Sequence, residues 1–153
     1  MPRDYGEVAT RIRAACAGED DAVALMATVA CELFHAFDDF HWVGFYRVVA
    51  PELLKVGPYQ GGHGCLAIPF ARGVCGAAAR EGRTQVVKDV DVFPGHIACE
   101  ASTRSEIVVP VFDRGGALVA VLDVDSDLPA AFGADDAAAL EALVAEVFAG
   151  AGR

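Results

Sequence analysis

The order of the predicted elements indicates an α+β fold, in which helices pack on one side of an antiparallel sheet. Three observations support it. Two helical patterns open the chain, apolar runs separated by glycine turns fill its middle, and one helical pattern closes it. A length of 153 residues with a 54% hydrophobic composition suits one compact domain, covering residues 1–153, with one substantial core.

The helical patterns lie at both ends of the chain. Two helices are predicted over residues 4–17 and 20–37, and three acidic residues stand where the second begins, which the helix dipole favours. Apolar residues at helical spacing give that helix one wide stripe: Val23, Met26, Val29, Ala30, Leu33, Phe34 and Phe37. After Gly133 a last helix is expected, with a buried stripe of Leu140, Leu143, Val144, Val147 and Phe148.

The first strand is predicted over residues 40–49, which are rich in aromatic and β-branched side chains. Trp42, Gly44 and Tyr46 share one face of it, so the two aromatics either floor a ligand pocket or fill the core. Further strands are expected over residues 53–56, 66–70 and 84–87, and a short helix over residues 77–81 that Gly82 ends. Four glycines and a proline favour an irregular loop over residues 57–65.

A hairpin over residues 106–112 and 117–125, with its turn at Gly115-Gly116, is the central feature of the sequence. A two-residue loop places Glu106 opposite Asp125, whereas a four-residue loop places it opposite Asp123. Asp123 and Asp125 point to the same face, so three carboxylates converge at the open end of the hairpin. Crowded carboxylates repel one another, which destabilises the sheet, and they tend to stay protonated. A site that uses a neutral acid, or that binds an ammonium group, would justify this cost. The alternative is a solvated strand end with its charges splayed apart.

Charge and hydropathy exclude several classes of partner. The formal net charge of −10 disfavours a nucleic-acid or anionic-membrane surface. No apolar run approaches the roughly 18 residues of a membrane span, and the N-terminus lacks the apolar region of a signal peptide. A cytoplasmic protein with reduced cysteines is therefore expected.

The five cysteines fall into two groups. Cys16 and Cys31 lie in predicted helices and are expected to pack as small apolar residues. Cys65, Cys75 and Cys99 lie on loops or where an element begins. Cys75 is near a helix N-terminus, where a thiolate is favoured. Cys99 is the leading nucleophile candidate because His96 precedes it by three residues, and in a helical turn a protonated imidazole would favour the thiolate. A second loop cysteine can close a disulfide if the Cα atoms come within about 4.4–6.8 Å.

A metal site is the competing interpretation of these loops, with His63, Cys65, His96 and Cys99 as ligands. Their spacing lacks a Cys-x-x-Cys pair and fits no structural zinc pattern well, so no metal is expected. Dinucleotide-binding, P-loop, Gly-x-Ser-x-Gly and His-Glu-x-x-His motifs do not occur.

Six segments together resemble the signatures of one family. They are His41-Trp42-Val43-Gly44-Phe45-Tyr46, Gly57-Pro58-Tyr59-Gln60-Gly61, Ile68-Pro69-Phe70-Ala71-Arg72-Gly73-Val74-Cys75-Gly76, Asp91-Val92-Phe93-Pro94-Gly95-His96-Ile97-Ala98-Cys99, Ser105-Glu106-Ile107-Val108-Val109-Pro110 and Leu122-Asp123-Val124-Asp125-Ser126. The family is the free methionine-(R)-sulfoxide reductases, which are stand-alone GAF domains. One departure is Gly62-His63-Gly64-Cys65, where the family is expected to read Lys-[Ile/Val]-Ala-Cys.

The resemblance implies a GAF fold, with the N- and C-terminal helices on one face of a central antiparallel sheet and a lidded ligand pocket on the other. It implies reduction of free L-methionine-(R)-sulfoxide without a cofactor, and recycling by thioredoxin or a dithiol. By position, Cys99 matches the catalytic cysteine, Cys65 the resolving cysteine that forms a disulfide with it, and Cys75 an auxiliary cysteine. The remaining matches hold the substrate: Trp42, Tyr46, Glu106, Asp123 and Asp125. GAF domains often pair, so a homodimer is a further expectation.

Two other functions are compatible with a GAF fold. A sensor would bind a small ligand without chemistry, but sensors usually accompany an output domain, for which 153 residues leave no room. A redox switch whose disulfide gates a partner would use the cysteines but gives the carboxylates no role.

Overall fold

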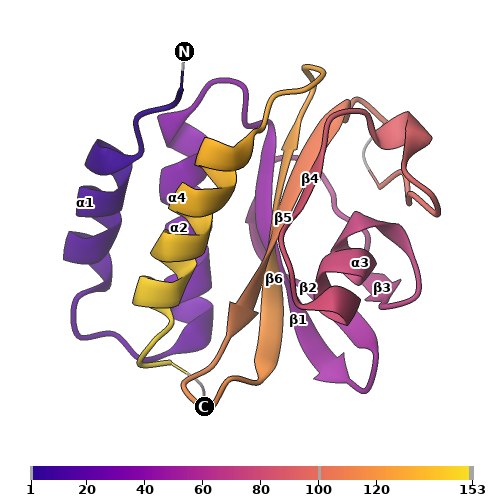
Figure 1. Ribbon diagram of the computed structural model, residues 1–153. Coiled ribbons are helices and arrows are strands. Elements are labelled where there is room, and N and C mark those ends of the chain that lie inside the picture. Colours follow the sequence, from indigo (N-terminus) through magenta and orange to yellow (C-terminus); the bar gives the residue numbers. More distant parts are fainter. Residues whose placement is uncertain (1, 100, 152–153) are drawn as a thin grey trace.

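The computed structural model describes residues 2–99 and 101–151. Its strands form one antiparallel sheet in the order β3-β2-β1-β6-β5-β4. The strands are β1 (Trp42–Ala50), β2 (Leu53–Gln60), β3 (Ala67–Pro69), β4 (Gln85–Val87), β5 (Ser105–Phe112) and β6 (Leu118–Ser126). The helices are α1 (Gly6–Cys16), α2 (Ala22–Ala36), α3 (Gly73–Glu81) and α4 (Ala134–Val147), with a 3₁₀ turn, η1, at Val90–Val92. Figure 1 shows α1, α2 and α4 on one side of the sheet and α3 on the other, which is the predicted α+β arrangement.

The sheet separates two apolar clusters. Val43 and Phe45 of β1 join the cluster beneath α1, α2 and α4. Trp42 and Tyr46 join the second cluster, which includes residues of α3. The alternation of side chains along β1 therefore confirms the two faces predicted for this strand. Among the described residues, none of the helices combines the length and apolarity that crossing a membrane requires.

The helix patterns were predicted well except at one position. Asp21 caps α2 by accepting hydrogen bonds from the backbone N–H groups of Val23 and Ala24. Val23 is itself 56% exposed, so its place in the predicted stripe was wrong. The buried face is instead rotated toward Leu25 and runs through Met26, Val29, Ala30 and Leu33.

Strand β2 and helix α3 are both longer than predicted. β2 continues through Gly57 and Pro58, because the pairing with β1 is irregular between Gly44 and Tyr46 and gives β2 an extra residue there. Its pairing with β3 covers only Leu53–Lys55, so Pro58 lies where no β3 partner requires its missing N–H. Helix α3 begins at Gly73, four residues before the predicted start, with a φ of +72° that favours glycine.

The hairpin of β5 and β6 sets the register of the carboxylates. Its loop has three residues, because the Asp113 N–H donates to the Ala117 carbonyl and Gly116 adopts a φ of +86°. A further irregularity beside Val111 shifts the pairing by one residue. Glu106 therefore pairs with Asp125, as the two-residue loop predicted, although the loop itself is different.

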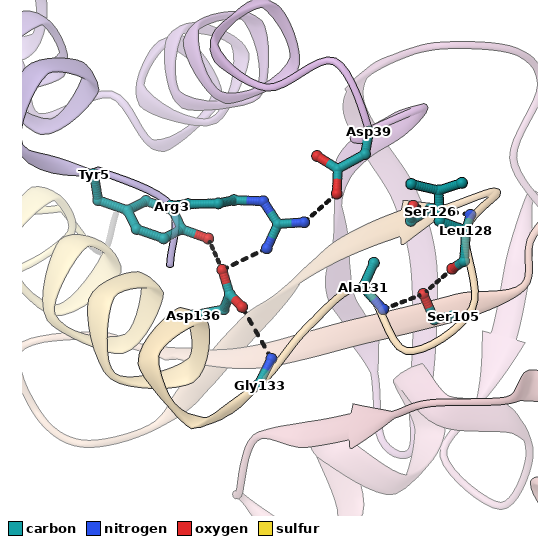
Figure 2. Close-up of polar contacts among 9 residues, drawn as sticks. All are labelled: Arg3, Tyr5, Asp39, Ser105, Ser126, Leu128, Ala131, Gly133 and Asp136. Carbon is teal, nitrogen blue, oxygen red and sulfur yellow. Dashed lines mark hydrogen bonds and ion pairs between the residues drawn. The ribbon is translucent and has the colours of Figure 1, made fainter. Parts of the chain in front are cut away.

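A polar cluster attaches the N-terminal segment to the start of α4 (Figure 2). The Arg3 guanidinium forms ion pairs with Asp39 and, at 2.7 Å, with Asp136. The Tyr5 hydroxyl also donates to Asp136 at 2.6 Å, and the Gly133 N–H donates to its second oxygen at 2.9 Å. One buried carboxylate thereby connects residues from both ends of the chain.

Two serines hold the loop that precedes α4, as Figure 2 also shows. The Ser105 hydroxyl donates to the Leu128 carbonyl at 2.6 Å and accepts from the Ala131 N–H at 3.1 Å. The Ser126 hydroxyl accepts from the Leu128 N–H. Because Ser105 and Ser126 directly neighbour Glu106 and Asp125, these bonds also fix the strand ends that carry two of the carboxylates.

Candidate active site

One pocket between the sheet and α3 brings the predicted site residues together. Its lining includes Trp42 and Tyr46 from β1, Cys75 from α3, Cys99 from the loop before β5, and the carboxylates Glu106, Asp123 and Asp125. The remaining predicted residue, Cys65, reaches the pocket through a disulfide to Cys99. Residues distant in the sequence meet here because β1 and β5 both flank β6 in the sheet.

The Trp42 indole is enclosed by glycines. A Cβ atom added to Gly44, Gly61 or Gly64 would lie within 2.8 Å of its side-chain atoms. The indole N–H donates to the Gly62 carbonyl at 2.9 Å, and the ring stacks on Tyr59 with centroids 5.2 Å apart. The glycines before Cys65 therefore do more than make a loop, since they let the backbone lie directly on the aromatic floor.

The Cys65–Cys99 disulfide closes the pocket. The two Cα atoms lie 5.2 Å apart, within the bridging range, so the pairing that the family resemblance implied is present. The closed pocket holds a cavity of about 30 Å³. Pockets that hold drug-sized ligands have about 300 Å³ or more, so the oxidised site is tightly filled by comparison.

The three carboxylates are buried together on the pocket face. Glu106, Asp123 and Asp125 are each less than 9% exposed. Burial first, and then the neighbouring Asp123, raise the pKa of Glu106 well above its usual range. Burial and Asp125 likewise raise the pKa of Asp123. Within the described chain, Asp123 Oδ1 is buried and has no hydrogen-bond partner. The cluster can therefore retain a proton at neutral pH while offering an oxygen to a donor in the pocket.

Cys75 differs from the sequence prediction. It is 3% exposed, and burial followed by the charge of Asp123 raises the pKa of its thiol. The prediction of a favoured thiolate was therefore wrong, because desolvation and acidic neighbours outweigh the helix N-terminus. Its Sγ and one oxygen each of Glu106 and Asp123 lie within 4.8 Å of one another. Cys75 is thus a neutral thiol packed against the carboxylates.

His96 also lies differently from the prediction. Residues 96–99 form no helical turn, and the imidazole Nε2 lies 4.0 Å from Glu106 Oε1. Burial lowers the pKa of His96, against an opposing effect of Asp91. A protonated imidazole that activates Cys99 was therefore the wrong interpretation, and the structure instead places His96 beside a carboxyl.

Two polar residues of the pocket region were not predicted. Thr103 lines the pocket and is 8% exposed, with its hydroxyl 3.3 Å from His41 Nε2. No local pattern marks a threonine between a loop and a strand as a pocket residue. His41 precedes Trp42 in the aromatic motif, but its pairing with Thr103 depends on the register of β1 and β6.

The alternative metal site does not form in this state. Two of its four candidate ligands, Cys65 and Cys99, are joined in the disulfide and supply no thiolate.

The fold and site define a GAF domain with a redox-active cysteine pair at its pocket. A GAF domain family model matches residues 16–147. The free methionine-R-sulfoxide reductase of Escherichia coli is 38% identical over 143 residues, which cover 94% of this chain and 86% of that protein.

Solved structures show the same likeness. The free methionine-R-sulfoxide reductase of Neisseria meningitidis, in complex with its substrate, superposes with a TM-score of 0.89 at 44% identity, covering 96% of this chain and 90% of that chain. The reduced form of fRMsr from Staphylococcus aureus gives 0.90 at 38% identity, with coverage of 96% and 94%. The chain belongs to the GAF domain family, in the group that contains the free methionine-R-sulfoxide reductases.

Proposed function

We propose that this protein reduces free L-methionine-(R)-sulfoxide to methionine, using Cys99 as the nucleophile and Cys65 as the resolving thiol. The observation that carries the proposal is a disulfide at the mouth of a pocket that holds aromatic side chains and buried carboxylates. The E. coli, N. meningitidis and S. aureus relatives support the substrate assignment, since their names state this activity or its abbreviation.

The first chemical step is attack on the sulfoxide sulfur. After Cys99 loses its proton to solvent, the thiolate attacks and the sulfoxide oxygen accepts a proton from the Glu106–Asp123 pair. The raised pKa of Glu106 supports its role as the neutral acid. The oxygen passes to Cys99, which becomes a sulfenic acid, and methionine leaves with its sulfur reduced by two electrons.

The second step forms the disulfide. The Cys65 sulfur attacks the sulfenic sulfur of Cys99, its thiol proton joins the departing hydroxyl, and water leaves. Because the oxidised pocket is tightly filled, formation of the disulfide leaves little space for methionine. Thioredoxin or a small dithiol then returns two electrons to the disulfide.

The carboxylates give the site its preference for a free amino acid. An ammonium group near Asp123 and Asp125 would donate to buried oxygens, including Asp123 Oδ1. A methionine residue inside a peptide lacks that ammonium group and would bring no such donor to Asp123 Oδ1. Trp42 packs against the S-methyl group from the floor of the pocket.

The test is a thiol count on fully reduced protein, before and after free methionine-(R)-sulfoxide is added without reductant. We expect two thiols to be lost for each methionine formed. Cys99→Ser should abolish both changes, whereas Cys31→Ser, on the helical side of the sheet, should alter neither. Binding of the sulfoxide without methionine or thiol loss would contradict the proposal and favour a sensor. The homodimer stays a prediction, which sedimentation of the oxidised protein tests.

A further inference from the structure

The loop that carries His96 is fixed against the start of α3. The Gly95 carbonyl accepts a hydrogen bond from the Gly73 N–H at 2.9 Å. On the other side of His96, Ile97 packs closely on Gly73, where an added Cβ would meet the Ile97 side chain at 3.3 Å. His96 therefore lies on a backbone held from both sides, and its imidazole has a defined place in the pocket lining.

From that place the imidazole lies near Glu106 and is the more exposed of the two side chains. Its Nε2 is 4.0 Å from Glu106 Oε1, and the side chain is 16% exposed against 8% for Glu106. A shift of about 1 Å brings the two atoms to hydrogen-bonding distance. Around the imidazole, Glu106 of β5 and Asp91 of η1 are the acidic groups that act on it most directly, and Asp123 and His63 line the same pocket.

The proposed reaction requires that the acid near His96 regain a proton after each turnover. Each turnover takes one proton from the Glu106–Asp123 pair and leaves a buried carboxylate without an adjacent lysine or arginine among the pocket-lining residues that the structure describes. The next turnover requires that proton again. A neutral imidazole can accept a proton from water on one nitrogen and release one from the other, which suits it to a relay.

We propose that His96 is a positioning and proton-relay residue, which orients the Glu106 carboxyl and returns to it the proton that the departing sulfoxide oxygen takes. This inference rests on the proposed reductase function. The relay adds no redox change: one proton enters the imidazole from water, and one leaves it for the Glu106 carboxylate. The proton that the Cys99 thiol released to solvent balances this uptake.

The relay is tested by His96→Asn during multiple turnovers with free methionine-(R)-sulfoxide and a saturating small dithiol, because the acid has to regain its proton between turnovers. We expect methionine formation to slow by about tenfold or more, with the dissociation constant of the sulfoxide unchanged. Added imidazole should restore part of the variant's lost rate. Lowering the pH of the buffer should raise the rate of the variant more than that of the wild type. His35→Asn removes an exposed imidazole in α2, on the other side of the sheet, and should retain the wild-type rate and pH profile.

Two results would overturn the relay. One is a wild-type rate and pH profile in His96→Asn. The other is a slow variant that imidazole does not rescue, which would mean that His96 contributes only by packing. Either result, with normal turnover by the wild type, leaves the reductase proposal standing. A wild type that forms no methionine removes the reductase and the relay together.

Discussion

At the scale of one residue, the buried carboxyl of Glu106 lowers the stability of the folded protein at neutral pH. Its carboxyl has a raised pKa in the folded protein because burial and Asp123 disfavour the charge. The folded state therefore binds its proton more tightly than the unfolded state does. This contribution to stability is fully present below the ordinary glutamate pKa, about 4.3, and is lost as the pH rises through the raised value.

Glu106→Gln should stabilise the oxidised protein at neutral and alkaline pH while removing most activity. A neutral amide has no charge to lose, so the melting temperature of the variant should exceed that of the wild type by about 2–4 °C for each 1 kcal/mol gained. Thermal unfolding followed by circular dichroism between pH 5 and 8 measures this difference, which should widen with pH. Glu52→Gln changes an exposed carboxyl and should show no such trend. A variant less stable than wild type at pH 8 would contradict the argument.

At the scale of elements, the segment between β2 and β3 carries Gly64 against the pocket floor. A Cβ on this residue would lie 2.8 Å from Trp42 Cζ2 and 2.8 Å from the Tyr46 hydroxyl. The family resemblance leads us to expect alanine at this position. In this protein the oxidised loop therefore lies closer to the aromatic floor than an alanine permits.

Gly64→Ala should slow disulfide closure more than sulfoxide reduction. The methyl group holds the loop off the indole, so Cys65 reaches the sulfenic acid of Cys99 less often, by a factor of about 5 to 10 for a cost near 1 kcal/mol. Trapping the sulfenic acid with dimedone during a single turnover should give more adduct than in the wild type. Gly115→Ala, in the β5–β6 turn, is the matched control and should trap no more. Equal trapping in Gly64→Ala and the wild type would refute the role of Gly64.

The sequence predicted elements and faces better than their ends. The face carrying Trp42 and Tyr46 and the convergence of Glu106, Asp123 and Asp125 followed from strand periodicity, which is a local property. The extension of β2 through Pro58 was missed. Proline is accommodated there by an irregular pairing with β1, which the local sequence of β2 does not reveal. The neutral state of Cys75 was missed because burial depends on contacts between distant segments. His96 was placed on the right loop, but its partner depends on how that loop packs on α3.

At the scale of the whole molecule, a helical layer that does not line the pocket stabilises the fold that carries the site. The N-terminal segment and α4 meet at Asp136, and the loop before α4 is hydrogen-bonded to Ser105 and Ser126 beside the carboxylates (Figure 2). Burial alone would raise the pKa of Asp136, but hydrogen bonds from Tyr5, the Gly133 N–H and Arg3 outweigh it and lower the pKa. Its contribution to stability is therefore present above the ordinary aspartate pKa and is lost as the pH falls through the lowered value.

Asp136→Asn should destabilise the protein by about 2 kcal/mol at pH 7, because Arg3 loses one of its two charged partners and Tyr5 keeps only a neutral acceptor. The melting temperature should fall by about 4–8 °C, and the difference from wild type should shrink toward pH 3 as the wild-type carboxyl becomes protonated. Asp135→Asn is the matched control, since it removes the same charge from the same helical turn at an exposed position. Because the cluster lies on the helical side of the sheet, the folded variant should retain the wild-type rate of methionine formation at 25 °C. A loss of rate without a loss of stability would mean instead that Asp136 acts on the pocket itself.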